Sequence, residues 1–122
     1  MRIFSFEKLD VWQLSRKLSI KVYELSRKFP EEEKFGLRSQ IRRAVISVSS
    51  NIAEGSSRSS GIEQARFTEI AYGSLLEVLN QLILASDLNY IDDENVNEFR
   101  AQIDELMNKM SKLRSSQISR GK

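Results

Sequence analysis

Apolar residues recur at intervals of three and four positions in four long segments of the chain, which is the spacing of a buried stripe on an α-helix. The last segment is the most regular, with a heptad-like seam formed by Val96, Phe99, Ile103, Leu106, Met110 and Leu113. Only one proline and five glycines occur in 122 residues, so long helices are favoured over sheets or disordered linkers. The sequence therefore predicts an all-α protein.

Breaks between the segments predict where the helices begin and end. Pro30 should end the first helix, and Gly55 should end the second as a left-handed cap. Ser60, with Glu63 three residues later, forms a capping-box pattern for the third helix, and Asp92 is the expected cap of the fourth. The predicted helices are 7–29, 31–54, 60–88 and 92–114, followed by a basic C-terminal tail at 115–122.

The length of the chain fits one domain that buries its apolar surface without cross-links or metals. The connections between the helices are short enough to make successive helices antiparallel neighbours. We therefore expect residues 1–122 to form a single antiparallel up-down-up-down four-helix bundle.

The second predicted helix carries a polar stripe beside its apolar one. The stripe consists of Gln40, Arg43, Ser47, Asn51 and Glu54. Its last three members are expected to form a buried hydrogen-bond network that fixes helix register, with a bound ligand or a partner's backbone as the alternative. Asp10 and Trp12, at the start of the first helix, are placed to close this network.

The third helix is apolar over more than one stripe. Its expected core positions are Ile70, Leu75, Val78, Leu79 and Leu82. A second apolar group lies outside this stripe and consists of Tyr72, Leu76, Ile83 and Leu84. Either this helix is simply the most central, or the second group is a subunit interface, which we favour because each helix of a four-helix bundle normally keeps a solvent face. Gly73 is expected to mark a close backbone approach, within the bundle or between subunits.

Positive charge is concentrated in two rows, although the net charge is only +2. Lys34, Arg38 and Arg42 are spaced by four on the second helix, and Lys17, Lys21 and Lys28 share one side of the first. Each row could follow a phosphate backbone, or it could hold solubilising charges and partners for an acidic helix of another subunit. Because no RNA-recognition signature with interleaved aromatic residues is present, base-specific recognition is not predicted.

The chain contains no histidine and no cysteine, which removes most catalytic and metal-binding classes. Di-iron Glu-x-x-His sites, zinc sites and Ser-His-Asp catalysis all need residues that are missing. A phosphate-cradling glycine loop is also missing. The scattered carboxylates suit a solvated surface, with carboxylate-only magnesium sites as the alternative. We therefore predict a non-enzyme without cofactor or metal. The start of the chain lacks the apolar core of a signal peptide, and no apolar run has membrane length, so a cytoplasmic protein is expected.

Three pieces of the sequence resemble a known family: FEKLDVWQLSRKL at 6–18, FPEEEKFGLRSQIRRAVISVSSNIAEGSSR at 29–58 and FTEIAYGSLLEVLNQLILASDLNYI at 67–91. The most specific part runs from Phe35 to Gly55. The family is that of four-helix-bundle proteins encoded in intervening sequences of bacterial 23S rRNA genes. Ser49 stands where this family often has proline, so a proline kink in the second helix is not carried over to this chain.

The resemblance implies antiparallel bundles that assemble into rings of five. It also implies a fold similar to the accessory variability determinant of diversity-generating retroelements, a basic pentameric barrel that works with a reverse transcriptase and nucleic acid. We therefore predict a homopentamer that binds RNA or other nucleic acid through phosphates, at Lys34, Arg38 and Arg42 first and at Lys17, Lys21 and Lys28 second. The alternative is a protein-interaction adaptor that makes no nucleic-acid contact and docks an acidic partner, such as a polymerase or a neighbouring subunit.

Overall fold

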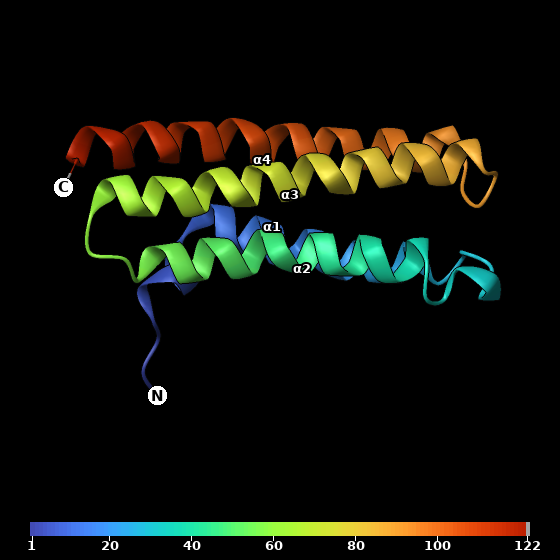
Figure 1. Ribbon diagram of the computed structural model, residues 1–122, viewed down its shortest axis with the longest axis horizontal. Helices are drawn as coiled ribbons and strands as arrows, with labels where there is room; N and C mark the ends of the chain where they lie inside the picture. Colours follow the sequence, from blue (N-terminus) through green and yellow to red (C-terminus); the bar gives the residue numbers. More distant parts are fainter. Residues whose placement is uncertain (122) are drawn as a thin grey trace.

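The computed structural model describes residues 1–121 of the chain. They form four α-helices, which are α1 (Asp10–Ser26), α2 (Leu37–Ser56), α3 (Gly61–Asp87) and α4 (Asp93–Arg120). Two short 3-10 turns, Ser5–Lys8 and Glu31–Glu33, precede α1 and α2. Successive helices run in opposite directions, and the two ends of the chain lie at the same end of the bundle (Figure 1). The predicted all-α four-helix bundle is confirmed.

One apolar core runs along the bundle and receives side chains from all four helices. Its largest fully buried aliphatic members include Leu18, Ile41, Leu75, Leu82, Ile103 and Leu106. The heptad seam predicted for α4 is confirmed, since its first five members are buried and Leu113 packs against the core from a partly buried position. Packing between neighbouring helices is uneven: α2 and α3 contact each other most, and α1 and α4 contact each other least. The α1–α4 side is therefore the most open seam of the bundle.

One expectation for α3 is wrong, and a second is contradicted in part. Ile70, expected in the core, has 52% of its surface exposed, whereas Leu75 is fully buried. Five positions separate them, which places their side chains about 140° apart around the helix. A Cβ atom at Gly73 would meet nothing within 4 Å, so this glycine marks no close approach within the bundle.

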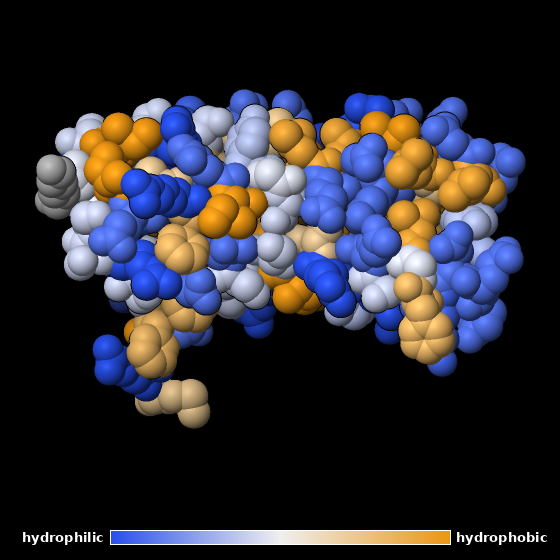
Figure 2. Space-filling view, in the orientation of Figure 1, coloured by the Kyte–Doolittle hydropathy of each residue, from blue (hydrophilic) through white to orange (hydrophobic). Residues whose placement is uncertain are grey.

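The second apolar group of α3 divides into exposed and half-buried members. Leu76 and Leu84 are each 44% exposed, whereas Tyr72 and Ile83 pack against the core from partly buried positions. Figure 2 shows apolar residues exposed along α3 on the side that faces the viewer. No helix in residues 1–121 combines the length and apolar character needed to cross a bilayer.

Gly55 does not end α2 as a left-handed cap, and that prediction is wrong. The residue is buried inside the helix, which continues to Ser56. A Cβ atom at Gly55 would lie 2.6 Å from Cβ of Phe67 on α3. The glycine is therefore required by the close approach of α3, a constraint that the sequence around Gly55 does not contain.

The predicted tail at 115–122 is helical over most of its length, because α4 continues to Arg120. Gln117 is buried and its Oε1 accepts a hydrogen bond of 2.7 Å from the Thr68 hydroxyl of α3. Ile62 N–H at the start of α3 donates to the Gly121 carbonyl at 3.1 Å. These contacts with α3 explain why α4 continues beyond the last residue of its apolar seam. Residue 122 of the predicted tail lies outside the described residues.

Both predicted N-caps of the later helices are confirmed. The Ser60 hydroxyl accepts from the Glu63 N–H at 3.1 Å, and the Asp92 carboxylate accepts from the Asn95 N–H at 2.8 Å. The first two helices begin later than predicted. Leu9 is extended before α1, and Gly36, at φ −105° and ψ −116°, separates the turn at Glu31–Glu33 from α2.

Candidate nucleic-acid interface

The connection between α1 and α2 is fixed by the carboxylate of Glu33. Its Oε1 accepts from the Leu37 N–H at 2.8 Å, at the half-buried start of α2, and its Oε2 accepts from the Tyr90 hydroxyl at 2.8 Å. The hydrogen bond from Leu37 has the largest effect in lowering the pKa of Glu33, and the bond from Tyr90 has the second largest. The bond between Tyr90 and Glu33 also raises the pKa of Tyr90. A Cβ atom at Gly36 would overlap Glu33 Oε1. One carboxylate thus caps α2 and ties this connection to the α3–α4 turn.

Arg38 binds the backbone at the end of α1. Its Nη2 donates to the Phe29 carbonyl at 2.6 Å and to the Pro30 carbonyl at 3.4 Å. These carbonyls follow the last turn of α1, where the helix no longer supplies hydrogen-bond partners. Arg38 Nε is buried and has no acceptor within residues 1–121. The guanidinium is therefore held in one place against the backbone that follows α1.

Arg42 makes a second set of contacts with α1. Its Nε donates to the Ser26 hydroxyl at 2.8 Å and its Nη2 to the Tyr23 carbonyl at 3.2 Å. The guanidinium carbon also lies 4.6 Å from the centre of the Tyr23 ring, within the range of a cation–π contact. Two members of the predicted basic row thus help to join α2 to α1.

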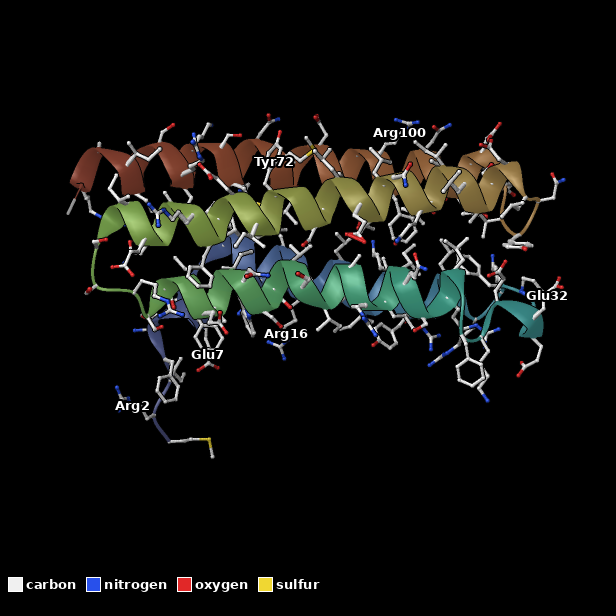
Figure 3. All side chains as sticks on the ribbon, in the orientation of Figure 1. Arg2, Glu7, Arg16, Glu32, Tyr72 and Arg100 are labelled. Atoms are coloured by element: carbon white, nitrogen blue, oxygen red, sulfur yellow. The ribbon has the colours of Figure 1, made fainter. Side chains whose placement is uncertain are left out.

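An open hollow of about 520 Å³ lies beside these arginines, over the outer surface of α1 and α2. We call it the basic hollow, and its lining residues are Tyr23, Lys34, Phe35, Arg38, Ser39, Arg42, Arg43 and Ile46. Four of them are cations, two are aromatic and none is a carboxylate. Glu32, in the same connection, lies at the tip of the bundle (Figure 3). The structure therefore brings Lys34, Arg38 and Arg42 to one surface of uniform charge.

Three further residues of the hollow, Arg43, Tyr23 and Phe35, were not predicted from the spacing of the basic row. Arg43 was assigned to the polar stripe, but it is exposed and lines the basic hollow. Tyr23 comes from α1, so spacing along α2 could not find it. Phe35 lies inside the helix predicted over 31–54, and its exposure follows from the connection that replaces the start of that helix.

The other basic row lies elsewhere and has a different setting. Lys17, Lys21 and Lys28 are all exposed. Lys21 and Lys28 line a groove of about 320 Å³ between α1 and α4, together with the carboxylates of Glu24 and Glu98. The structure does not bring the two rows together, and Lys17 lines neither the groove nor the basic hollow.

Within the polar stripe of α2, Ser47 contacts α3, and the network is smaller than predicted. The hydroxyls of Ser47 and Ser74 lie 2.9 Å apart, and Asn51 Nδ2 donates to the Ser47 carbonyl at 2.8 Å. Glu54 does not take part, because its side chain is 63% exposed and lies 3.9 Å from Arg58. Ser47 and Asn51 thus form the predicted hydrogen bonds, but in a half-buried setting instead of a buried one, and the prediction is wrong for Glu54.

Asp10 and Trp12 do not close the polar network. Asp10 forms an exposed ion pair with Lys109 of α4, and its hydrogen bond is the main cause that raises the pKa of Lys109. Trp12 packs edge-on against Phe6, with ring centres 5.1 Å apart. The prediction failed because Ser47 binds Ser74 of α3, whereas Asp10 pairs with α4 and Trp12 packs against the turn that precedes α1.

Comparison with known proteins supports the same fold. A crystal structure of a protein of unknown function from the S23 ribosomal protein family of Bacteroides thetaiotaomicron VPI-5482 is similar, with a TM-score of 0.63 and 23% sequence identity. The match covers 89% of this chain and 95% of that one. No relative was found among curated proteins. The profile of the 23S rRNA-intervening sequence protein family matches residues 7–112. The chain therefore belongs to the family of 23S rRNA-intervening sequence proteins.

Proposed function

We propose that this protein is a non-enzymatic, oligomeric four-helix bundle that binds RNA or other nucleic acid through phosphate contacts at the basic hollow. The observation that carries the proposal is the gathering of Lys34, Arg38, Arg42 and Arg43 around one hollow that no carboxylate lines. Such a surface attracts a polyanion and releases its condensed counterions, which favours binding to any sequence.

The four cations of the hollow have two different roles in the proposed binding. Lys34 and Arg43 are exposed and form no ion pair within residues 1–121, so their charged groups are available to phosphate. Arg38 and Arg42 are anchored on the end of α1, so they supply fixed positive charge at little further entropic cost. Arginine held in this way is well suited to phosphate recognition.

Assembly into a ring of five, which the family resemblance implies, belongs to the same proposal. The exposed apolar residues Ile70, Leu76 and Leu84 support it, because a chain that stayed single would leave these groups of α3 in water. A ring would also repeat the basic hollow and strengthen binding to a long nucleic acid through multivalency. Light scattering should then give five times the 14.1 kDa mass of the chain.

The test of phosphate binding compares two double variants that each remove two positive charges. K34A/R43A alters the basic hollow, whereas R66A/K112A removes exposed cations that do not line it. Fluorescence anisotropy with a labelled structured RNA at several salt concentrations gives the affinity and its salt dependence. The first variant should bind every sequence more weakly, with a salt slope smaller by about 1 for each phosphate that it no longer neutralises.

The control variant should retain most of the affinity and nearly the whole slope. Equal losses in both variants would mean that only net charge matters, and an absence of RNA binding by the unaltered protein would refute the proposal.

A protein-interaction adaptor is the second candidate, because the same cations and the exposed Phe35 and Tyr23 could also receive an acidic protein segment. A partner that remains bound after nuclease treatment, and that K34A/R43A releases, would favour this function over nucleic-acid binding.

A further inference from the structure

Phe35 is the most exposed aromatic side chain among residues 1–121, with 88% of its surface accessible. Phe29, at the other end of the same connection, is only 2% exposed and packs against Tyr90. The connection therefore buries one aromatic residue, Phe29, in the core and leaves a second, Phe35, outside it. An isolated exposed apolar residue is ordinary, but this ring borders the basic hollow.

The backbone around Phe35 is held in place on both sides. Glu33 binds the Leu37 N–H and the Tyr90 hydroxyl, each at 2.8 Å, and its carboxylate occupies the space beside Gly36. The chain before Phe35 is thus fixed to the chain after it and to the α3–α4 turn. The position of this ring outside the bundle is part of the fold, and little ordering remains to be done when a ligand binds.

Cations flank the ring in a defined arrangement. Lys34 Nζ lies 5.6 Å from the centre of the Phe35 ring, and the exposed Arg43 lines the same hollow. Tyr23, which is 37% exposed and has Arg42 against its ring, contributes a second aromatic group. A flat apolar ring beside several cations, with no carboxylate in the lining, matches a ligand that has an aromatic face and a negative charge.

We propose that Phe35 is a stacking platform for an unpaired base, whose neighbouring phosphates bind Lys34 and Arg43. This inference rests on the proposed function and narrows its ligand to a single-stranded segment of RNA or DNA. A duplex has the same phosphates, but its base faces are stacked inside the helix and cannot reach the ring. Stacking on aromatic side chains tolerates every base, so the site selects unpaired structure and not sequence.

The experiment uses three labelled ligands with equal numbers of phosphates: a single-stranded oligoadenylate, a strand of the same length that lacks bases, and a duplex RNA. Each is titrated with the full chain and with the variants F35A, F35L and F35Y. F35L keeps an apolar group without a flat ring, and F35Y keeps the ring. Thermal unfolding checks that each variant retains the stability of the unaltered protein, as expected for a side chain with so few contacts.

We expect the unaltered protein to bind oligoadenylate more tightly than the strand without bases. F35A and F35L should bind oligoadenylate about 5- to 150-fold more weakly, with unchanged affinity for the strand without bases and for the duplex. F35Y should bind all three ligands as the unaltered protein does. The salt dependence should stay the same in all variants, because no phosphate contact is removed.

Equal binding of the strands with and without bases, or an F35A variant that retains its affinity for oligoadenylate, would overturn the stacking proposal and leave phosphate binding intact. A protein that binds none of the three ligands would overturn both. The two proposals can therefore fail separately.

Discussion

The basic hollow on α1 and α2 and the groove between α1 and α4 each contain cations from one of the two predicted rows, yet they differ in what surrounds those cations. The hollow has four cations and no carboxylate in its lining. The groove combines Lys21 and Lys28 with Glu24 and Glu98. Two rows that look alike in the sequence thus produce one surface of uniform charge and one of mixed charge.

The difference comes from the partner helix and from one hydrogen-bonded acid. In the groove, α4 contributes Glu98, and α1 itself contributes Glu24. Beside the hollow, Glu33 directly precedes Lys34 in the sequence, but its carboxylate is bound to Leu37 and Tyr90 and does not line the hollow. The local electrostatic field therefore depends on the tertiary partners of a basic row more than on its spacing.

The largest effect should come from replacing Arg38 by alanine, because a basic residue of the hollow also supports the fold. The variant loses two bonds to the Phe29 and Pro30 carbonyls at the end of α1. We expect the free energy of unfolding to fall by about 2 kcal/mol, as for a hydrogen bond to a charged group. The matched variant in the other row, K28A, should lose less than about 0.5 kcal/mol because Lys28 is an exposed surface residue.

Urea denaturation of both variants measures this contrast. Equal stability losses would show that Arg38 does not hold α1 and α2 together, and the structural difference between the two rows would then disappear.

Much of the bundle follows from local sequence signals. The α4 seam, the Ser60 and Asp92 caps and the antiparallel order all depend on residues that are close together in the chain. Ile70 was misplaced because α3 is apolar on several sides, so periodicity alone does not select its core stripe. Gly55 was misassigned because its role depends on Phe67, a residue of the next helix.

The candidate site could also be predicted in part: the sequence predicts which cations lie together but not what they contact. Spacing by four predicted that Lys34, Arg38 and Arg42 share one surface, and all three line the hollow, although Lys34 lies in the connection before α2. Spacing could not show that Arg38 binds the backbone that follows α1, that Arg42 binds α1 itself, or that Tyr23 faces Arg42 from the other helix. These are contacts between helices, and a pattern within one helix carries no information about them.

The next largest effect concerns Glu33, whose carboxylate does not line the hollow. It should be visible in how the stability of the protein depends on pH. The hydrogen bonds to Glu33 lower its pKa in the folded chain below the ordinary value of 4.5. Its contribution to stability is therefore fully present above that value and is lost as the pH falls through the lowered pKa. The melting temperature should drop more steeply below pH 4.5 in the unaltered protein than in E33Q.

Circular dichroism melts across the acid range give this comparison, with E32Q as the control because Glu32 is exposed in the same connection. E32Q should follow the unaltered protein throughout. Parallel curves for E33Q and the unaltered protein would mean that the Leu37 and Tyr90 bonds do not favour the charged carboxylate.

The smallest effect should come from making the α1–α4 groove resemble the hollow. E24Q/E98Q removes the two carboxylates that line the groove beside Lys21 and Lys28. These changes are made in the K34A/R43A background, in which the hollow has lost two of its cations. Any gain in RNA affinity then comes from another surface of the protein. We expect a gain of up to about fivefold, since a single exposed charge pair contributes about 0.2–1 kcal/mol.

The matched control for this change, E94Q/D104N, removes two exposed acids of α4 that do not line the groove. Because it changes the net charge by the same amount, it measures the non-specific part of any gain in anisotropy titrations. A larger gain for E24Q/E98Q than for the control would show that the nearby carboxylates prevent Lys21 and Lys28 from binding RNA. Identical gains would mean that RNA responds to the total charge of the bundle, and the arrangement of cations around the hollow would then not explain where nucleic acid binds.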